Sequence, residues 1–110
     1  AVKSYYQEYH PAVFRALGYL AKAFSAAGKS VSVCGELGGD PLAIPVLAGL
    51  GIHKLSMGLA SIPGAKRVIR NLDMAEAKAL AAQVQTMKTD EEIRACLTDF
   101  SQRHETDRRN

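Results

Sequence analysis

Cys34 is the residue of this sequence best suited to do chemistry. It stands at the end of a short β-branched run and is followed by Gly-Glu-Leu-Gly-Gly-Asp, residues 35–40. A thiol is a nucleophile when ionised and a proton donor when protonated. The glycines of such a loop let the backbone approach a ligand closely. A free cysteine is also commonly a small buried hydrophobe, so the residues alone leave both interpretations open.

Two carboxylates lie in the same loop. Glu36 could serve as a general base or could tie down the turn, and the sequence favours neither role. Asp40 precedes Pro41, which is the order of a helix cap followed by a first helical residue. We therefore expect Asp40 to be a cap rather than a metal ligand, and we assign no metal ligand in this segment.

The charged residues do not indicate a polyanionic partner. The net charge is +3 over 110 residues, and no aromatic side chains are interleaved with the basic ones as base stacking requires. The group Lys66, Arg67 and Arg70 could attract an anionic substrate, but a helix C-terminus explains Arg70 at least as well. We therefore expect no nucleic-acid binding.

Membrane insertion and metal binding are equally unsupported. The longest apolar run, residues 42–52, is too short to span a bilayer and contains Pro45. The two cysteines, Cys34 and Cys96, form no Cys-x-x-Cys pair, so a zinc site has no support. One disulfide is arithmetically possible. No signal-peptide pattern opens the chain, which favours free thiols and a cytoplasmic location.

The elements that must position Cys34 can be predicted from spacing. A helix should begin near Pro11 and end at Gly28, and strands should cover residues 30–34 and 53–57. Between the strands, residues 42–50 are apolar on nearly every face, which predicts a buried helix. Strand, helix and strand at this spacing form a βαβ unit with parallel strands.

Three more helices should follow the second strand. Residues 62–70 form the first, and Asp73 and Thr89 begin the other two in capping-box-like patterns. Cys96 falls in period with Ile93 and Leu97, so we expect it to pack in the core. We assign residues 1–103 to one domain segment and residues 104–110 to a polar tail that frays.

This organisation predicts an incomplete α/β domain. Two parallel strands do not make a stable sheet, because parallel sheets need several strands with helices on both faces. The chain is therefore part of a larger fold, or it completes itself with partners. Exposed strand edges also favour pairing with another copy, so a homo-oligomer is expected.

Several motifs resemble one family in its own order. The segment 33–40, Val-Cys-Gly-Glu-Leu-Gly-Gly-Asp, resembles the Cys-Gly-Glu motif of Enzyme I of the phosphoenolpyruvate-dependent sugar phosphotransferase system. The similarity runs from about residue 10 to residue 100. It continues through the segments 43–51, 55–57, 61–63 and 69–71.

The resemblance implies a fold and an activity. It implies the C-terminal portion of a (β/α)₈ TIM barrel with two parallel strands and about five helices. The parent enzyme would bind phosphoenolpyruvate and Mg²⁺, with metal ligands outside this segment. It would pass the phosphoryl group to a protein histidine in a separate N-terminal domain, and then to an HPr-type phosphocarrier protein. Cys34 would protonate the pyruvate enolate, with Gly35 and Glu36 as weaker candidates near the substrate.

Departures from the family pattern leave two alternatives open. No segment here matches the family's phosphate-binding arginines or its phosphorylated histidine, so the fragment alone should be inactive. It could then be a non-catalytic dimerisation or regulatory module. The Gly-Gly-Asp-Pro run, residues 38–41, also resembles pyruvate phosphate dikinase, whereas the segments 61–63 and 69–71 favour Enzyme I.

Overall fold

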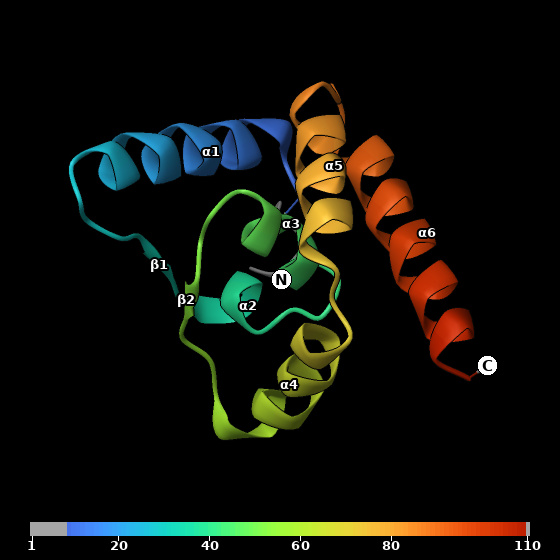
Figure 1. Cartoon of the computed structure of the whole chain (residues 1–110). Coiled ribbons are helices and arrows are strands. Elements are labelled where there is room, and N and C mark those ends of the chain that lie inside the picture. The colour runs from blue at the N-terminus through green and yellow to red at the C-terminus, as the bar shows by residue number, and fades with distance from the viewer. Residues whose placement is uncertain (1–8, 110) are drawn as a thin grey trace, which may run out of the picture.

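The computed structural model of the chain describes residues 9–109, except for the side chains of residues 35, 36 and 105–109. Helices dominate the described part, together with one two-stranded sheet (Figure 1). The elements in chain order are α1 (Pro11–Ala26), β1 (Ser32–Val33), α2 (Gly35–Gly38), α3 (Ile44–Gly49), β2 (Lys54–Leu55), the 3₁₀ helix η2 (Leu59–Ser61), α4 (Ile62–Arg70), α5 (Met74–Gln85) and α6 (Asp90–Arg109).

Helix α1 begins and ends where the sequence predicts. Pro11 occupies the first turn, where N–H groups have no intrahelical acceptor, so its missing N–H costs no hydrogen bond. The His10 ring accepts a hydrogen bond from the Ala12 N–H at 3.0 Å. The helix ends at Ala26, and Gly28 follows with φ +74°. That left-handed conformation favours glycine, which confirms the predicted helix stop.

The two strands pair in parallel, as the βαβ pattern predicts. Ser32 pairs with Lys54 and Val33 pairs with Leu55. Each strand has only two residues, fewer than the five predicted for each. The ladder is short because each strand has a single neighbour within the described part of the chain. The fold is thus a helix-rich α/β arrangement.

Helix α3 begins at Ile44 rather than at residue 42. The Asp40 carbonyl accepts hydrogen bonds from the N–H groups of Ala43 and Ile44, so the residues after Asp40 form a turn. Pro45 has no N–H with which to bond the Pro41 carbonyl four residues earlier. The α-helical hydrogen-bond ladder is therefore interrupted at Pro45 and the regular helix begins late, although the helix is as buried as predicted.

The core lies where α3 packs against α5, with α1 and α6 adding side chains around this contact. Its largest fully buried side chains come from four helices and the segment before β2: Phe14, Ile44, Val46, Leu47, Ile52, Val84, Ile93 and Leu97. Gly49 makes the α3–α5 contact possible, because a Cβ at this position would overlap the Ala77 carbonyl. Close helix packing here thus depends on a missing side chain.

The last two helices begin at the predicted caps. The Asp73 carboxylate accepts hydrogen bonds from the N–H groups of Ala75 and Glu76 at 2.8 and 3.1 Å. Thr89 Oγ1 accepts from the Glu92 N–H at 3.1 Å. These bonds satisfy N-terminal donors that no intrahelical carbonyl can reach.

The prediction that the chain frays from residue 104 is wrong for the backbone. Helix α6 continues without a break to Arg109. The His104 ring stacks on Phe100 at 4.0 Å and lies 2.7 Å from the Glu76 carboxylate of α5. This tertiary contact, which polar composition does not reveal, supports the helix past residue 103. No helix among the described residues is long and apolar enough to cross a bilayer.

Candidate functional site

Cys34 lies at the carboxyl end of β1, and its side chain is exposed. Val33, directly before it, is buried, and the Val33 carbonyl accepts a hydrogen bond from the Ser56 N–H at 2.8 Å. The strand is therefore fixed to its neighbour one residue before the thiol. The expected position of Cys34 at a strand end is confirmed. A thiol there is open to a ligand that approaches the strand ends.

The turn after Cys34 is held against the ends of both strands. A Cβ on Gly38 would stand 2.6 Å from the Val33 carbonyl oxygen and 2.8 Å from the Ser56 carbonyl oxygen. Such distances are far inside van der Waals contact. The sequence predicts that these glycines admit a ligand, but at Gly38 the close neighbour is the protein backbone itself. This glycine lets α2 rest on the strand ends.

Asp40 anchors the other end of the Cys34 loop. Its carboxylate accepts hydrogen bonds from the Tyr9 hydroxyl and from the Leu42 N–H, the latter at 3.0 Å. The Arg94 guanidinium lies 4.5 Å from the centre of the Tyr9 ring, within the range of a cation–π contact. The prediction that Asp40 caps a helix begun by Pro41 is wrong, because the N-cap residue of α3 is Ala43 and the Asp40 carboxylate instead caps the turn before the helix. Sequence analysis missed Tyr9, because no local pattern links it to a loop 31 residues away.

The other two predicted site residues, Gly35 and Glu36, are the first two residues of α2. The side chain of Glu36 lies outside the described residues, and so does Gly35 apart from its helical backbone. Their proximity to substrate therefore stays a prediction. Within the described part of the chain, no three His, Cys, Asp or Glu side chains gather as a metal site requires.

The second cysteine has a different environment. Cys96 is partly buried and packs against the core, as its helical period predicts. Burial raises the pKa of its thiol, the Asp99 carboxylate raises it further, and Arg103 acts in the opposite direction. Both cysteines are free thiols. Cys96 is thus a core thiol, whereas Cys34 is the exposed one.

The basic residues of α4 are exposed and follow the carboxyl end of β2. Lys66, Arg67 and Arg70 line an open concavity of about 410 Å³ together with Ile62 and Pro63. Figure 1 shows α2 beside β2, α4 below the strands and α1 above them. The helix that carries these basic side chains therefore lies on the side of the strands opposite to α1. Arg67 and Arg70 lie in the last turn of α4, where a cation is also favoured by the helix dipole.

The chain is similar to known phosphoenolpyruvate enzymes. Residues 1–74 match the family described as PEP-utilising enzyme, PEP-binding domain. The chain is 42% identical over 88 residues to the phosphoenolpyruvate-protein phosphotransferase of Staphylococcus carnosus, which covers 80% of this chain and 15% of the relative. It is 40% identical over 88 residues to the enzyme of the same name from Bacillus subtilis, with the same two shares.

A third relative is Multiphosphoryl transfer protein 2 of Escherichia coli. It is 38% identical over 99 residues, which are 90% of this chain and 12% of the relative. The chain thus spans between 12% and 15% of the length of these three relatives. Since the family match covers more than half of the chain, the chain belongs to the PEP-utilising enzymes, in the part described as their PEP-binding domain.

Proposed function

We propose that this chain is the segment of a phosphoenolpyruvate-dependent phosphotransferase that protonates the pyruvate enolate. The observation that carries the proposal is the exposed Cys34 thiol at the carboxyl end of β1. Catalytic residues of barrels built from alternating strands and helices stand at such strand ends. The names of the relatives, phosphoenolpyruvate-protein phosphotransferase among them, support this class of enzyme.

The proposed chemical step needs one proton. Transfer of the phosphoryl group of phosphoenolpyruvate to a protein histidine leaves the enolate of pyruvate. The S–H bond of Cys34 breaks while a C–H bond forms at the enolate C3, which gives pyruvate and a thiolate. Solvent returns a proton to the sulfur before the next turnover. A thiol is mostly protonated near neutral pH, which suits it to this role.

The rest of the machinery would come from other parts of the protein. We propose that β1 and β2 are the last two strands of a (β/α)₈ barrel in a cytoplasmic enzyme that serves an HPr-type carrier. The family implies Mg²⁺, but the described residues contain no cluster of His, Cys, Asp or Glu that fits a metal. Other parts of the protein would therefore supply the metal ligands, and Cys34 would contribute its proton without binding the metal.

The proposal is tested in the full-length enzyme that carries this segment. Cys34→Ala and Cys34→Ser should each lower pyruvate formation by about 10²–10⁴-fold, the usual contribution of a positioned general acid. Phosphoenolpyruvate that carries one deuterium and one tritium at C3 in a defined arrangement adds a second readout, since a protein acid delivers its proton to one face and the methyl group of the pyruvate is then chiral. The variants should give pyruvate without facial preference. Cys96→Ala is the matched control and should keep both the rate and the stereochemistry.

Near-normal, stereospecific pyruvate formation in both Cys34 variants would remove the assigned role. The family membership of the chain would stand, but another group would have to be the acid. Loss of phosphoryl transfer to the histidine in the same variants would indicate a structural defect. Transfer to the protein histidine is therefore measured in parallel by incorporation of labelled phosphate.

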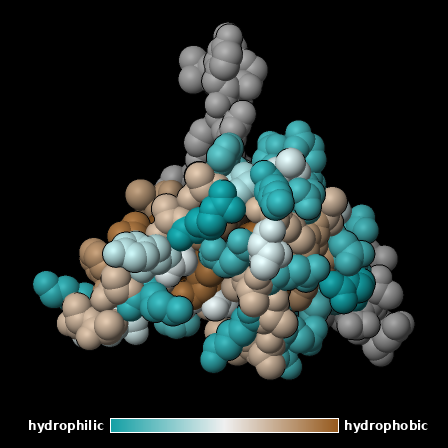
Figure 2. All heavy atoms as spheres, turned by 90° about the horizontal axis from the view of Figure 1, so that it is seen from above, coloured by the Kyte–Doolittle hydropathy of each residue, from teal (hydrophilic) through white to brown (hydrophobic). Residues whose placement is uncertain are grey.

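Self-association of this chain is the second candidate function. Apolar side chains on α1 reach the surface, with Tyr19, Leu20 and Phe24 at exposed fractions of 74%, 40% and 42%. Figure 2, seen from above where α1 faces the viewer, shows apolar spheres mingled with polar ones on this face. Sedimentation at several concentrations tests for an oligomer. A monomer at all of them would contradict this candidate.

A further inference from the structure

The two faces of the β1–β2 sheet have different surroundings. Val33 is buried and Leu55 is partly buried, and both pack against the hydrophobic core. Successive side chains of a strand point to opposite faces, so the residues on either side of this pair belong to the other face. Those four residues are all exposed: Ser32, Cys34, Lys54 and Ser56. The exposed face of the sheet is thus the face that carries the Cys34 thiol.

The carboxyl ends of the strands bring Ser56 level with Cys34. Val33 pairs with Leu55, so the next position of the same parallel register joins residues 34 and 56. The Ser56 N–H donates a hydrogen bond of 2.8 Å to the Val33 carbonyl, which carries the ladder as far as this position. Neighbouring strands lie about 4.8 Å apart. The thiol and the hydroxyl therefore occupy adjacent strand ends on one face.

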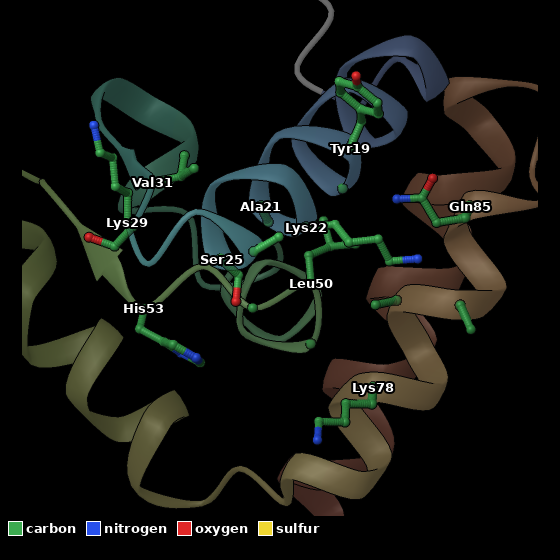
Figure 3. Close-up of a pocket in the computed structure, with 17 residues that line it drawn as sticks. Tyr19, Ala21, Lys22, Ser25, Lys29, Val31, Leu50, His53, Lys78 and Gln85 are labelled. Atoms are coloured by element: carbon green, nitrogen blue, oxygen red, sulfur yellow. The ribbon is translucent and has the colours of Figure 1, made fainter.

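The amino ends of the strands face a different space. Residues 29–31 and His53, which lead into β1 and β2, line an open hollow between α1, α3 and α5 (Figure 3). Ser32 and Lys54 are the first residues of the strands, so they lie toward that hollow. Cys34 and Ser56 follow the last residues of the strands, so they are the pair that a ligand at the carboxyl ends would meet.

Close backbone packing fixes the position of Ser56. A Cβ on Gly38 would stand 2.8 Å from the Ser56 carbonyl oxygen, so α2 rests directly on the residue that carries the hydroxyl. A Cβ on Gly39 would stand 3.0 Å from the Cβ of Met57, the next residue. The loop after Cys34 and the loop after β2 thus hold each other in place. A donor on such a fixed backbone loses little conformational freedom when it binds a ligand.

The Ser56 hydroxyl has no structural task within the described part of the chain. It forms no hydrogen bond with any described residue. It does not cap the 3₁₀ helix η2 either, because the N-cap of η2 is Gly58. An exposed serine is ordinarily a solvated surface residue. Ser56 differs from such a residue in its register position beside the proposed proton donor.

We propose that Ser56 is a substrate-binding residue of the Cys34 site, where its hydroxyl donates a hydrogen bond to an oxygen of the three-carbon substrate. The inference rests on the proposed function of Cys34. The substrate carries its oxygens on C1 and C2, next to the C3 atom that the thiol protonates. A donor one strand away from the sulfur can therefore reach an oxygen while the sulfur reaches C3. A hydrogen bond to an anionic oxygen is charge-assisted, and it orients C3 toward the thiol.

The test compares serine variants of the full-length enzyme that carries this segment. Ser56→Ala should lower kcat/KM for phosphoenolpyruvate by about 10- to 100-fold, the range for a hydrogen bond to a charged group. Ser56→Thr keeps a hydroxyl and should restore most of the lost activity. Ser32→Ala is the matched control, because it removes the same group from the same face at the other end of the strand. It should leave kcat/KM unchanged.

The chirality of the pyruvate methyl group separates a lost contact from a displaced thiol. Ser56→Ala should keep the facial preference, because Cys34 still delivers the proton. Loss of that preference would overturn the binding role, since the substitution would then have moved the thiol. An unchanged kcat/KM in Ser56→Ala, an equal loss in Ser56→Thr or an equal loss in Ser32→Ala would also overturn it.

Cys34→Ala in the same assay distinguishes the two proposals. If Cys34→Ala is impaired while Ser56→Ala is normal, only the role of Ser56 fails. If both variants form pyruvate at the normal rate, the proposed function of Cys34 fails as well. Circular dichroism of each variant accompanies the kinetics, so that unfolding is distinguished from lost binding.

Discussion

The hydroxyl of Tyr9 donates a hydrogen bond to the carboxylate of Asp40, across 31 residues of sequence. The Tyr9 side chain is almost completely buried, and it carries the Arg94 guanidinium over its ring. The same carboxylate caps the turn before α3 through the Leu42 N–H. The Tyr9–Asp40 contact thus joins the segment before α1 to the loop that follows Cys34.

Tyr9→Phe should lower the free energy of unfolding by about 1 kcal/mol, because Asp40 loses one hydrogen-bond donor while the ring keeps its packing. Urea unfolding measured by circular dichroism provides the value. Tyr19→Phe is the control, since Tyr19 is 74% exposed and should change stability by less than about 0.5 kcal/mol. Equal effects of the two substitutions would show that the Tyr9–Asp40 bond contributes nothing net.

Gly49→Ala should destabilise the chain by about 1–3 kcal/mol, the usual range for overpacking. The added methyl group would overlap the Ala77 carbonyl, and α3 and α5 would have to separate. Gly64→Ala is the matched control on α4, where an added Cβ meets nothing within 4 Å. There alanine should stabilise by up to about 1 kcal/mol through helix propensity. A neutral Gly49→Ala would mean that the α3–α5 contact is loose.

Asp73→Ala should cost about 1 kcal/mol, because it removes the acceptor for two N–H groups at the start of α5. Thermal unfolding followed at 222 nm measures the change. Asp99→Ala is the control, since it removes a carboxylate whose ion pair with Arg103 is exposed at both ends. Such a pair contributes little, so this variant should stay within about 0.5 kcal/mol of the parent. The cap prediction fails if the two variants melt alike.

Local signals predict more of this fold than long-range ones. Gly28, Asp73 and Thr89 mark helix ends within a few residues of their hydrogen-bond partners, so the sequence around each is sufficient. The shortness of the two strands could not be predicted from local sequence, because the length of a strand depends on which other strands pair with it. The parallel pairing is nevertheless correct, because a strand, a buried helix and a second strand allow few other arrangements.

In the candidate site, too, local features could be predicted from the sequence and long-range contacts could not. Cys34 can be placed from sequence because a glycine-rich loop follows a β-branched run. The contribution of Tyr9 cannot, because its contact with Asp40 joins segments 31 residues apart in the sequence that meet only in the folded chain. The continuation of α6 past residue 103 also depends on a contact between helices, that of His104 with Glu76.

The two thiols should differ in their reaction with iodoacetamide. The reactive form is the thiolate, Cys34 is exposed, and burial followed by Asp99 raises the pKa of Cys96. Mass spectrometry of peptides after brief alkylation at about pH 8 should therefore find label on Cys34 first. Cys34→Ala should abolish the fast phase, whereas Cys96→Ala should leave it unchanged. Faster labelling of Cys96 would show that the packing around α6 opens readily.

The raised pKa of Cys96 also sets the sign of a pH effect on stability. The folded state disfavours the thiolate, so the unfolded chain loses this proton first as the pH rises. The contribution of Cys96 is therefore complete below the ordinary thiol pKa and is lost as the pH rises through the folded pKa. In a Cys34→Ala background, the free energy of unfolding should fall between about pH 7 and pH 10. Adding Cys96→Ala should make that fall shallower, and an unchanged slope would contradict the assignment.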